Sequence, residues 1–195
     1  MHADYPTLKY AVDPDGRLTE QEWFNFTRLW SKINVPYKEI LTSQGSVERK
    51  IYFVLEGILR IYHVDFKGRD TTLAFTYSGD FGGVLDSYLL GSKSQYYYES
   101  LSAATLLVCN KSDLDTFLDS NTLLASKVEQ NYYMTISGLM ARIVQLQSQS
   151  SEEKFASLMK RSPHIINLIP HKYLANYIGI HPSNFSKFLN TIKID

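Results

Sequence analysis

The chain has 195 residues, 44% of them hydrophobic, and its 20 Lys and Arg residues balance its 20 Asp and Glu residues. We expect one domain with a buried core, a small second domain and no membrane span, and the single cysteine, Cys109, excludes an internal disulfide and a multi-cysteine metal site. The zero net charge argues against a strongly basic nucleic-acid binder, although residues 151–195 alone carry six basic residues against three acidic ones.

The N-terminal part of the chain predicts an arm followed by a helix. Residues 1–17 are polar and rich in turn formers, so we expect a loose arm. Its start, from Met1 to Pro6, lacks the basic and then apolar pattern of a secretion signal, and we therefore expect a cytoplasmic protein. A capping box at Thr19 and Glu22, followed by aromatic residues at mostly helical spacing up to Ile33, predicts a short helix.

From about Tyr37 the pattern changes to short strands separated by turns that contain glycine. The predicted strands are residues 39–42, 51–55, 58–64, 71–76, 96–101 and 105–109. Many short strands at regular spacing indicate a barrel or a two-sheet jelly roll. After the strands, Ser112 is predicted to cap a short helix that runs through Leu118.

A long amphipathic helix is predicted from Leu123 to Gln149, and about 25 residues of helix would measure roughly 37 Å. Its apolar residues recur at alternating steps of four and three and form one seam, which consists of Tyr132, Ile136, Leu139, Ile143 and Leu146. This seam suits either a helix packed on its own domain or a contact between two copies of the chain.

The residues after this helix predict a helix-turn-helix. A domain boundary is expected in the polar stretch 145–151, a helix over 152–160, and a short segment between Pro163 and Pro170. Ala175 and Gly179 then stand four residues apart, which suits a close helix approach and a tight turn. The apolar positions around them are Leu174, Ile178, Ile180, Phe185 and Phe188, and Pro182 suits the first position of the second helix. An ordinary pair of packed helices is the alternative interpretation.

If this motif reads DNA, the polar residues outside its packing are the ones that contact the major groove. These candidate residues are Lys172, His181, Ser183, Asn184, Ser186, Lys187 and Asn190. Lysine and helix N-terminal groups would hold phosphates, whereas Asn and Ser side chains would contact base edges. Because the second helix carries only Lys187 as a firm cation, we expect a shallow salt dependence and an affinity that relies on two copies in a dimer.

Three stretches together resemble the CRP/FNR family of bacterial transcription regulators. Residues 51–62 resemble the family's strand, Glu-Gly turn and strand, Gly79 to Phe81 resemble the turn into its ligand cassette, and Lys172 to Lys187 resemble its DNA-reading motif. The resemblance extends from about Leu18 over nearly the whole remaining chain. It implies an α+β fold with a jelly-roll-like β-roll of the cyclic-nucleotide-binding type, a long dimerisation helix and a C-terminal all-α helix-turn-helix domain.

The resemblance also implies an organisation and a set of partners. The expected domains are a sensor β-roll over residues 1–120, the dimerisation helix over 121–149 and the DNA-binding domain over 150–195. Candidate partners are double-stranded DNA, a second copy of the chain and RNA polymerase, and no enzyme activity is implied. Since the sequence given ends at Asp195, we do not expect the hairpin wing found in longer members of the family.

The chain departs from the family at the residues that hold the cyclic phosphate in members that bind cyclic nucleotides. In those members a Gly-Glu pair is followed, about ten residues later, by an Arg and then a Ser or Thr. Counted without gaps, Gly83 keeps the family's Gly, but Val84 stands at the Glu position and Ser94 at the Arg position. Burying a phosphate without a cation costs several kcal/mol, and Lys93 could supply the cation only if the register slips by one residue. We therefore expect that cyclic AMP and cyclic GMP do not bind in the family's manner and that no cofactor is bound. The candidate pocket residues for an unidentified effector are Gly82, Gly83, Val84, Ser94, Gln95 and Tyr96, with ordinary sheet packing of the tyrosines as the alternative.

Two competing functions remain open from the sequence. A metal-dependent enzyme built on a β-roll would need several histidines and a carboxylate in the roll, but only His63 lies in the strand region. A ligand-free interaction module, whose helix-turn-helix packs without binding DNA, is favoured by the weakly basic second helix. The redox-sensing branch of the family needs a cysteine cluster near the N-terminus, and this chain has none there.

Overall fold

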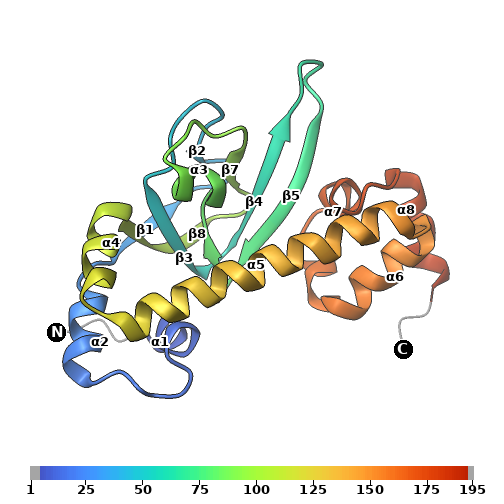
Figure 1. The fold of residues 1–195 in the computed structure, drawn as a ribbon. Helices are drawn as coiled ribbons and strands as arrows, with labels where there is room; N and C mark the ends of the chain where they lie inside the picture. Colours follow the sequence, from blue (N-terminus) through green and yellow to red (C-terminus); the bar gives the residue numbers. More distant parts are fainter. Residues whose placement is uncertain (1–4, 193–195) are drawn as a thin grey trace. The chain divides into compact units, whose positions relative to one another are not determined.

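The computed structural model describes residues 5–192, so our expectations about Met1 to Asp4 and about Asp195 lie outside the described residues. The chain forms two compact units, one of residues up to Asp70 with Ala74–Gln130, and one of Thr71–Leu73 with Asn131–Asp195. The long helix α5 (Thr122–Ser148) gives its first turns to the first unit and the remainder to the second (Figure 1). Within the described part of the chain, no helix has the length and apolar character needed to cross a membrane.

The first unit is built on two antiparallel four-stranded sheets, ordered β1-β8-β3-β6 and β2-β7-β4-β5. The strands are β1 (Ser31–Val35), β2 (Ile40–Thr42), β3 (Lys50–Glu56), β4 (Ile58–Val64), β5 (Asp70–Tyr77), β6 (Phe81–Gly82), β7 (Tyr97–Ser100) and β8 (Ala104–Asn110). Both sheets contribute to one apolar core, in which Val54, Leu59, Tyr98 and Leu106 have no exposed surface. The predicted β-roll is confirmed.

Four helices complete the first unit, namely α1 (Pro6–Val12), α2 (Glu20–Thr27), α3 (Leu85–Leu90) and α4 (Lys111–Asp119). A second core lies where α1, α2 and α4 pack with the first turns of α5 (Figure 1), and it contains Leu8, Phe26, Leu114 and Leu124. The predicted capping box is present, because the Thr19 hydroxyl accepts the Glu22 N–H and the Glu22 carboxylate accepts the Thr19 N–H. The capping box of Thr19 and Glu22, which are close neighbours in sequence, therefore determines where α2 begins.

Three local predictions in this unit are wrong. The arm predicted over residues 1–17 contains α1, which Pro6 opens and which is held by the buried side chains of Leu8 and Val12. The helix predicted up to Ile33 ends at Thr27, because Ile33 instead pairs with Leu106 in the neighbouring strand. Helix α4 begins at Lys111, after Asn110, so the predicted cap at Ser112 lies inside the helix.

The second unit groups α6 (Ser151–Arg161), a 3₁₀ turn (Pro163–Asn167), α7 (His171–Ile178) and α8 (Pro182–Thr191) around the C-terminal part of α5 (Figure 1). A capping box at Ser150 and Glu153 starts α6. Gly179 ends α7 in the left-handed conformation, at φ 66°, as the predicted tight turn requires. Phe155 of α6 meets the ring of Phe185 at 5.1 Å between centroids, and this contact holds α8 in place. The predicted helix-turn-helix is confirmed.

Replacement of Gly57 tests the close approach in the turn between β3 and β4. A Cβ atom at Gly57 would lie 2.6 Å from the Ala103 carbonyl oxygen, whereas a Cβ atom at Gly68 would have no neighbour within 4 Å, and both residues have positive φ. We expect Gly57→Ala to lower the free energy of unfolding by at least about 1 kcal/mol more than Gly68→Ala. Urea unfolding followed by tryptophan fluorescence reports on this unit, since Trp23 and Trp30 both lie in it. Equal effects of the two substitutions would show that the close approach is not a constraint.

Candidate functional site

The predicted ligand cassette begins where β6 leads into α3. Gly82 pairs with Tyr52 of β3, Gly83 follows with a φ of 117°, and Val84 precedes the first turn of α3. Val84 is 1% exposed and belongs to the core of the β-roll. Gly82, Gly83 and Val84 are therefore brought together at the inner side of the roll.

The side chain of Tyr98 fills the space beside Gly82. A Cβ atom at Gly82 would clash with the Tyr98 hydroxyl. It would also lie 2.8 Å from Cζ of Tyr98, the ring carbon that bears the hydroxyl. The hydroxyl shares a hydrogen bond of 2.8 Å with Thr76, and the ring lies 5.5 Å from that of Tyr52 between centroids. Burial raises the pKa of Tyr98, so the hydroxyl stays neutral. The interior next to the cassette is thus occupied by an uncharged aromatic side chain.

A buried carboxylate lies on the other side of the cassette. Glu48 is 4% exposed, and its Oε2 atom would be 3.8 Å from a Cβ atom at Gly83. The carboxylate accepts hydrogen bonds from the Thr42 hydroxyl and, at 3.0 Å, from the Lys50 N–H. A phosphate group bound at Gly83 would be repelled by this negative charge, so the carboxylate disfavours phosphate binding there. Glu48 could not be predicted from the sequence, because a single Glu in a loop before a strand does not indicate which part of the structure the loop will face.

The other predicted pocket residues are used in different ways. Ser94 is 1% exposed, and its hydroxyl donates to the Tyr96 carbonyl at 2.7 Å and accepts the Tyr96 N–H at 2.9 Å. The Gln95 side chain is exposed, and the carbonyl of Gln95 lies 3.0 Å from Nδ1 of His63. Tyr96 packs partly on the core of the roll. The position at which the family places its arginine therefore holds a hydroxyl that serves a local turn.

The predicted DNA-contacting residues all lie on the surface of α7 and α8. Lys172, His181, Ser183, Asn184, Ser186, Lys187 and Asn190 are exposed. Phe185, between them in sequence, has no exposed surface and anchors α8 against α6 and α7. The His181 imidazole caps α8 by accepting the Ser183 N–H at 3.3 Å. Helix α8 therefore presents one continuous polar face that includes a single cation.

The predicted seam on α5 is largely uncovered within the second unit. Ile136, Leu139 and Ile143 are 55%, 49% and 50% exposed. Further exposed apolar side chains on the same helix are Tyr133, Met134, Met140 and Val144. Two members of the seam differ from these three. Tyr132 is half-buried, and Leu146 is 38% exposed but lies 3.6 Å from where a Cβ atom at Gly179 would be. The end of the seam thus packs against the helix-turn-helix of its own chain.

Comparison with known proteins agrees with this architecture. Residues 32–121 match the family model of the cyclic nucleotide-binding domain. The chain is 23% identical over 142 residues to the nitrogen fixation regulation protein FixK of Bradyrhizobium diazoefficiens, a match that covers 73% of this chain and 58% of FixK. The chain therefore spans less than two thirds of the length of that relative.

Two solved structures share the fold. FixK2 from Bradyrhizobium japonicum superposes with a TM-score of 0.74 at 15% identity, over 83% of each chain. A protein of Eubacterium rectale that is assigned to the CRP/FNR family of transcriptional regulators gives a TM-score of 0.68 at 19% identity, over 89% of this chain and 82% of that one. The resemblance to the CRP/FNR family, in fold and in the order of its parts, is confirmed.

A double-mutant cycle tests the hydrogen bond that holds Tyr98 in the roll. Thr76→Val leaves the buried Tyr98 hydroxyl without this partner, and we expect it to cost about 1–3 kcal/mol of stability. Tyr98→Phe on the Thr76→Val background removes the stranded hydroxyl and should cost much less than Tyr98→Phe alone. Urea unfolding of the four proteins measures the coupling, and strictly additive effects would mean that the two hydroxyls do not interact.

Proposed function

Because the chain has the CRP/FNR fold, we propose that it is a dimeric, DNA-binding regulator of transcription whose β-roll does not take cyclic nucleotides. The observation that carries this proposal is the polar face of α8. The buried Phe185 side chain, on the opposite face of the helix, holds α8 in place. The exposed residues of this helix are Ser, Asn and Lys, and its buried side is held by aromatic packing. Such a helix suits insertion into the major groove.

The chemistry of this face divides the contacts into two kinds. Lys187, together with Lys172 at the start of α7, would neutralise backbone phosphates. The amides of Asn184 and Asn190 match the donor and acceptor pattern of adenine, and the Ser183 and Ser186 hydroxyls accept or donate to several bases. Two cations per copy give little nonspecific affinity, so two copies must bind together, with half-sites about 34 Å apart.

The exposed apolar residues of α5 are the proposed contact with the second copy. Ile136, Leu139 and Ile143 would each bury about half of their surface when an identical helix packs on them. This burial stabilises association, since each fully buried aliphatic side chain contributes about 1.5–3 kcal/mol. The proposed organisation keeps a sensor over 1–120, a dimerisation helix over 121–149 and a DNA-binding domain over 150–195, in a cytoplasmic protein that acts on RNA polymerase.

Two features support the loss of cyclic-nucleotide binding. The buried carboxylate of Glu48 lies at Gly83, and no cation stands at Ser94 to offset a phosphate charge. The ring of Tyr98 fills the interior beside Gly82, so a purine or ribose would have to displace a side chain that is fully buried. An effector of this roll would have to be uncharged or cationic at the cassette.

A Lys187→Gln substitution tests the proposed DNA interface. In fluorescence-anisotropy titrations against genomic fragments we expect the substitution to weaken binding about tenfold at low salt, and to reduce the slope of log affinity against log salt by about one for each copy. Lys67→Gln, in the exposed hairpin of the first unit, is the matched control and should leave the affinity unchanged. Saturating cyclic AMP should alter neither titration. If the unmodified chain binds no fragment at low salt, the helix-turn-helix is a scaffold and the interaction module becomes the leading function.

Charge placed in the α5 seam tests the proposed dimer. Ile136→Asp combined with Ile143→Asp would bury two carboxylates per chain at a helix pair, and we expect the protein to sediment as a monomer. Phe66→Asp is the control, since Phe66 is 92% exposed and lies in the hairpin between β4 and β5. A dimer that persists in the double variant at micromolar concentration would place the interface elsewhere.

A further inference from the structure

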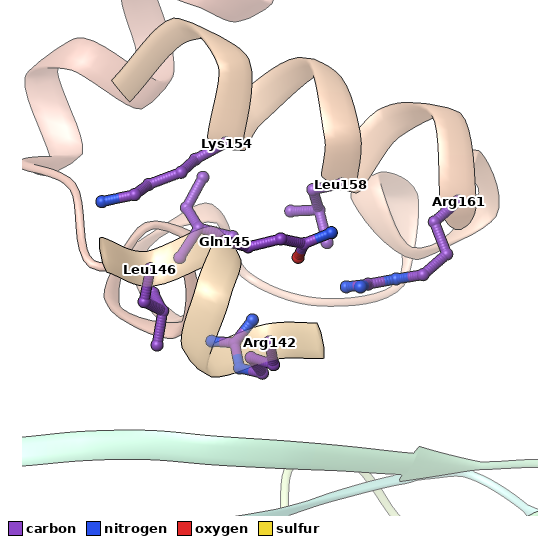
Figure 2. Close-up of a pocket in the computed structure, with 7 residues that line it drawn as sticks. Arg142, Gln145, Leu146, Lys154, Leu158 and Arg161 are labelled. Atoms are coloured by element: carbon purple, nitrogen blue, oxygen red, sulfur yellow. The ribbon is translucent and has the colours of Figure 1, made fainter. Parts of the chain in front are cut away.

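A crevice in the second unit is lined by three cations. Arg142 and Gln145 of α5 and Lys154 and Arg161 of α6 surround a floor that includes Leu158 and Ile178. Figure 2 shows Lys154 and Arg161 on opposite sides of the crevice, with Leu158 between them and Arg142 projecting from α5. The enclosed part of the crevice has room for about one water molecule, so a ligand would bind at its mouth, open to solvent.

Arg142 is half-buried and is held without a carboxylate. Its guanidinium lies 3.4 Å from the ring centroid of Tyr177, and it donates to the Tyr177 carbonyl at the C-terminal end of α7. An aromatic face and a carbonyl dipole both attract a cation, but neither carries a full negative charge. The positive charge of Arg142 is therefore only partly compensated.

The neighbouring cations add to this uncompensated charge. Arg161 donates to the Tyr177 hydroxyl at 3.4 Å, and within residues 5–192 no carboxylate lies within ion-pair distance of Arg142, Lys154 or Arg161. Burial lowers the pKa of Arg142, Tyr177 raises it in part, and the charge of Arg161 lowers it again, with a net lowering. Arg161 is exposed and Lys154 is half-buried, so water solvates part of this positive charge, and a bound anion would compensate more of it.

We propose that this crevice binds the phosphate-type oxyanion of a small soluble compound. The Arg161 guanidinium can match two oxygens of such an anion through parallel hydrogen bonds, and the neighbouring Gln145 amide can donate to a third. The Lys154 ammonium points away from both groups in Figure 2 and would join them by a change of rotamer. The partly apolar lining lowers the local dielectric and strengthens these charge-assisted bonds. The chemistry selects for phosphate and similar doubly charged oxyanions over chloride, which cannot accept in this fork geometry.

The location favours a small anion over the DNA backbone. The proposed DNA contacts begin at Lys172, in the first turn of α7, and continue on α8, whereas the crevice is lined by Ile178 at the last turn of α7 and by no residue of α8. A bound oxyanion would join α5 to α6 directly. Through the contacts of Arg142 and Arg161 with Tyr177, it would also brace α7 against the end of α5.

Inorganic phosphate titrated into the full chain tests the proposal. Calorimetry and thermal unfolding are measured in sodium phosphate and in sodium chloride at matched ionic strength. We expect saturable binding of phosphate and a rise in Tm that chloride does not produce. The double variant Lys154→Gln with Arg161→Gln should weaken the apparent affinity about tenfold or more. Lys160→Gln, an exposed lysine on the same helix, is the matched control and should bind as the original chain does.

Two results would overturn the proposal. One is a phosphate response no larger than the chloride response; the other is an unchanged response in the double variant. Circular dichroism checks that the double variant is folded, and the single Arg161→Gln variant serves in its place if it is not. DNA titrations in chloride buffer separate the two sources of phosphate. A tenfold loss of DNA affinity in a variant whose parent shows no saturable phosphate binding would assign the crevice to the DNA backbone instead.

Discussion

The contact between Tyr98 and Gly82 sets how the β-roll closes. Tyr98 belongs to β7 in one sheet and Gly82 to β6 in the other, so the ring spans the interior and fixes the distance between the sheets. The hydroxyl is held by Thr76, which keeps a buried polar group satisfied. The side chain that packs the roll is therefore also the one that occupies the place beside the cassette, so the packing of the roll and the proposed lack of a nucleotide pocket have a common cause.

Aromatic packing also determines what the second unit can present. Phe155 lies against Phe185 and Phe188, so the buried side of α8 is fixed and its polar residues must face outward. The end of α5 is attached to the same body through Arg142 and Tyr177. In the proposed complex with DNA, polar side chains on a helix anchored in this way would lose little conformational freedom, which favours a specific fit despite few charges.

Features that depend on neighbours in sequence could be predicted. Gly57, Gly179 and Pro182 each impose a local backbone conformation, and the turn or helix start that they mark is where the structure has it. Features that depend on contacts between residues far apart in the sequence could not be predicted. Ile33 has helical spacing but joins a strand because Leu106 lies opposite, and Glu48 becomes part of the cassette only after the loop that carries it folds against Gly83.

The buried Glu48 also bears on what an arginine at position 94 would do. The backbone of Ser94 is hydrogen-bonded to Gly45 and Ser46, in the loop that leads to Glu48. An arginine introduced at position 94 would stand beside the loop that carries this carboxylate, and the two opposite charges would attract each other. A cyclic-nucleotide site here would therefore need an acid and an aromatic ring to be removed as well as a cation to be added, and removal of the Tyr98 side chain alone would leave a cavity in the core of the roll.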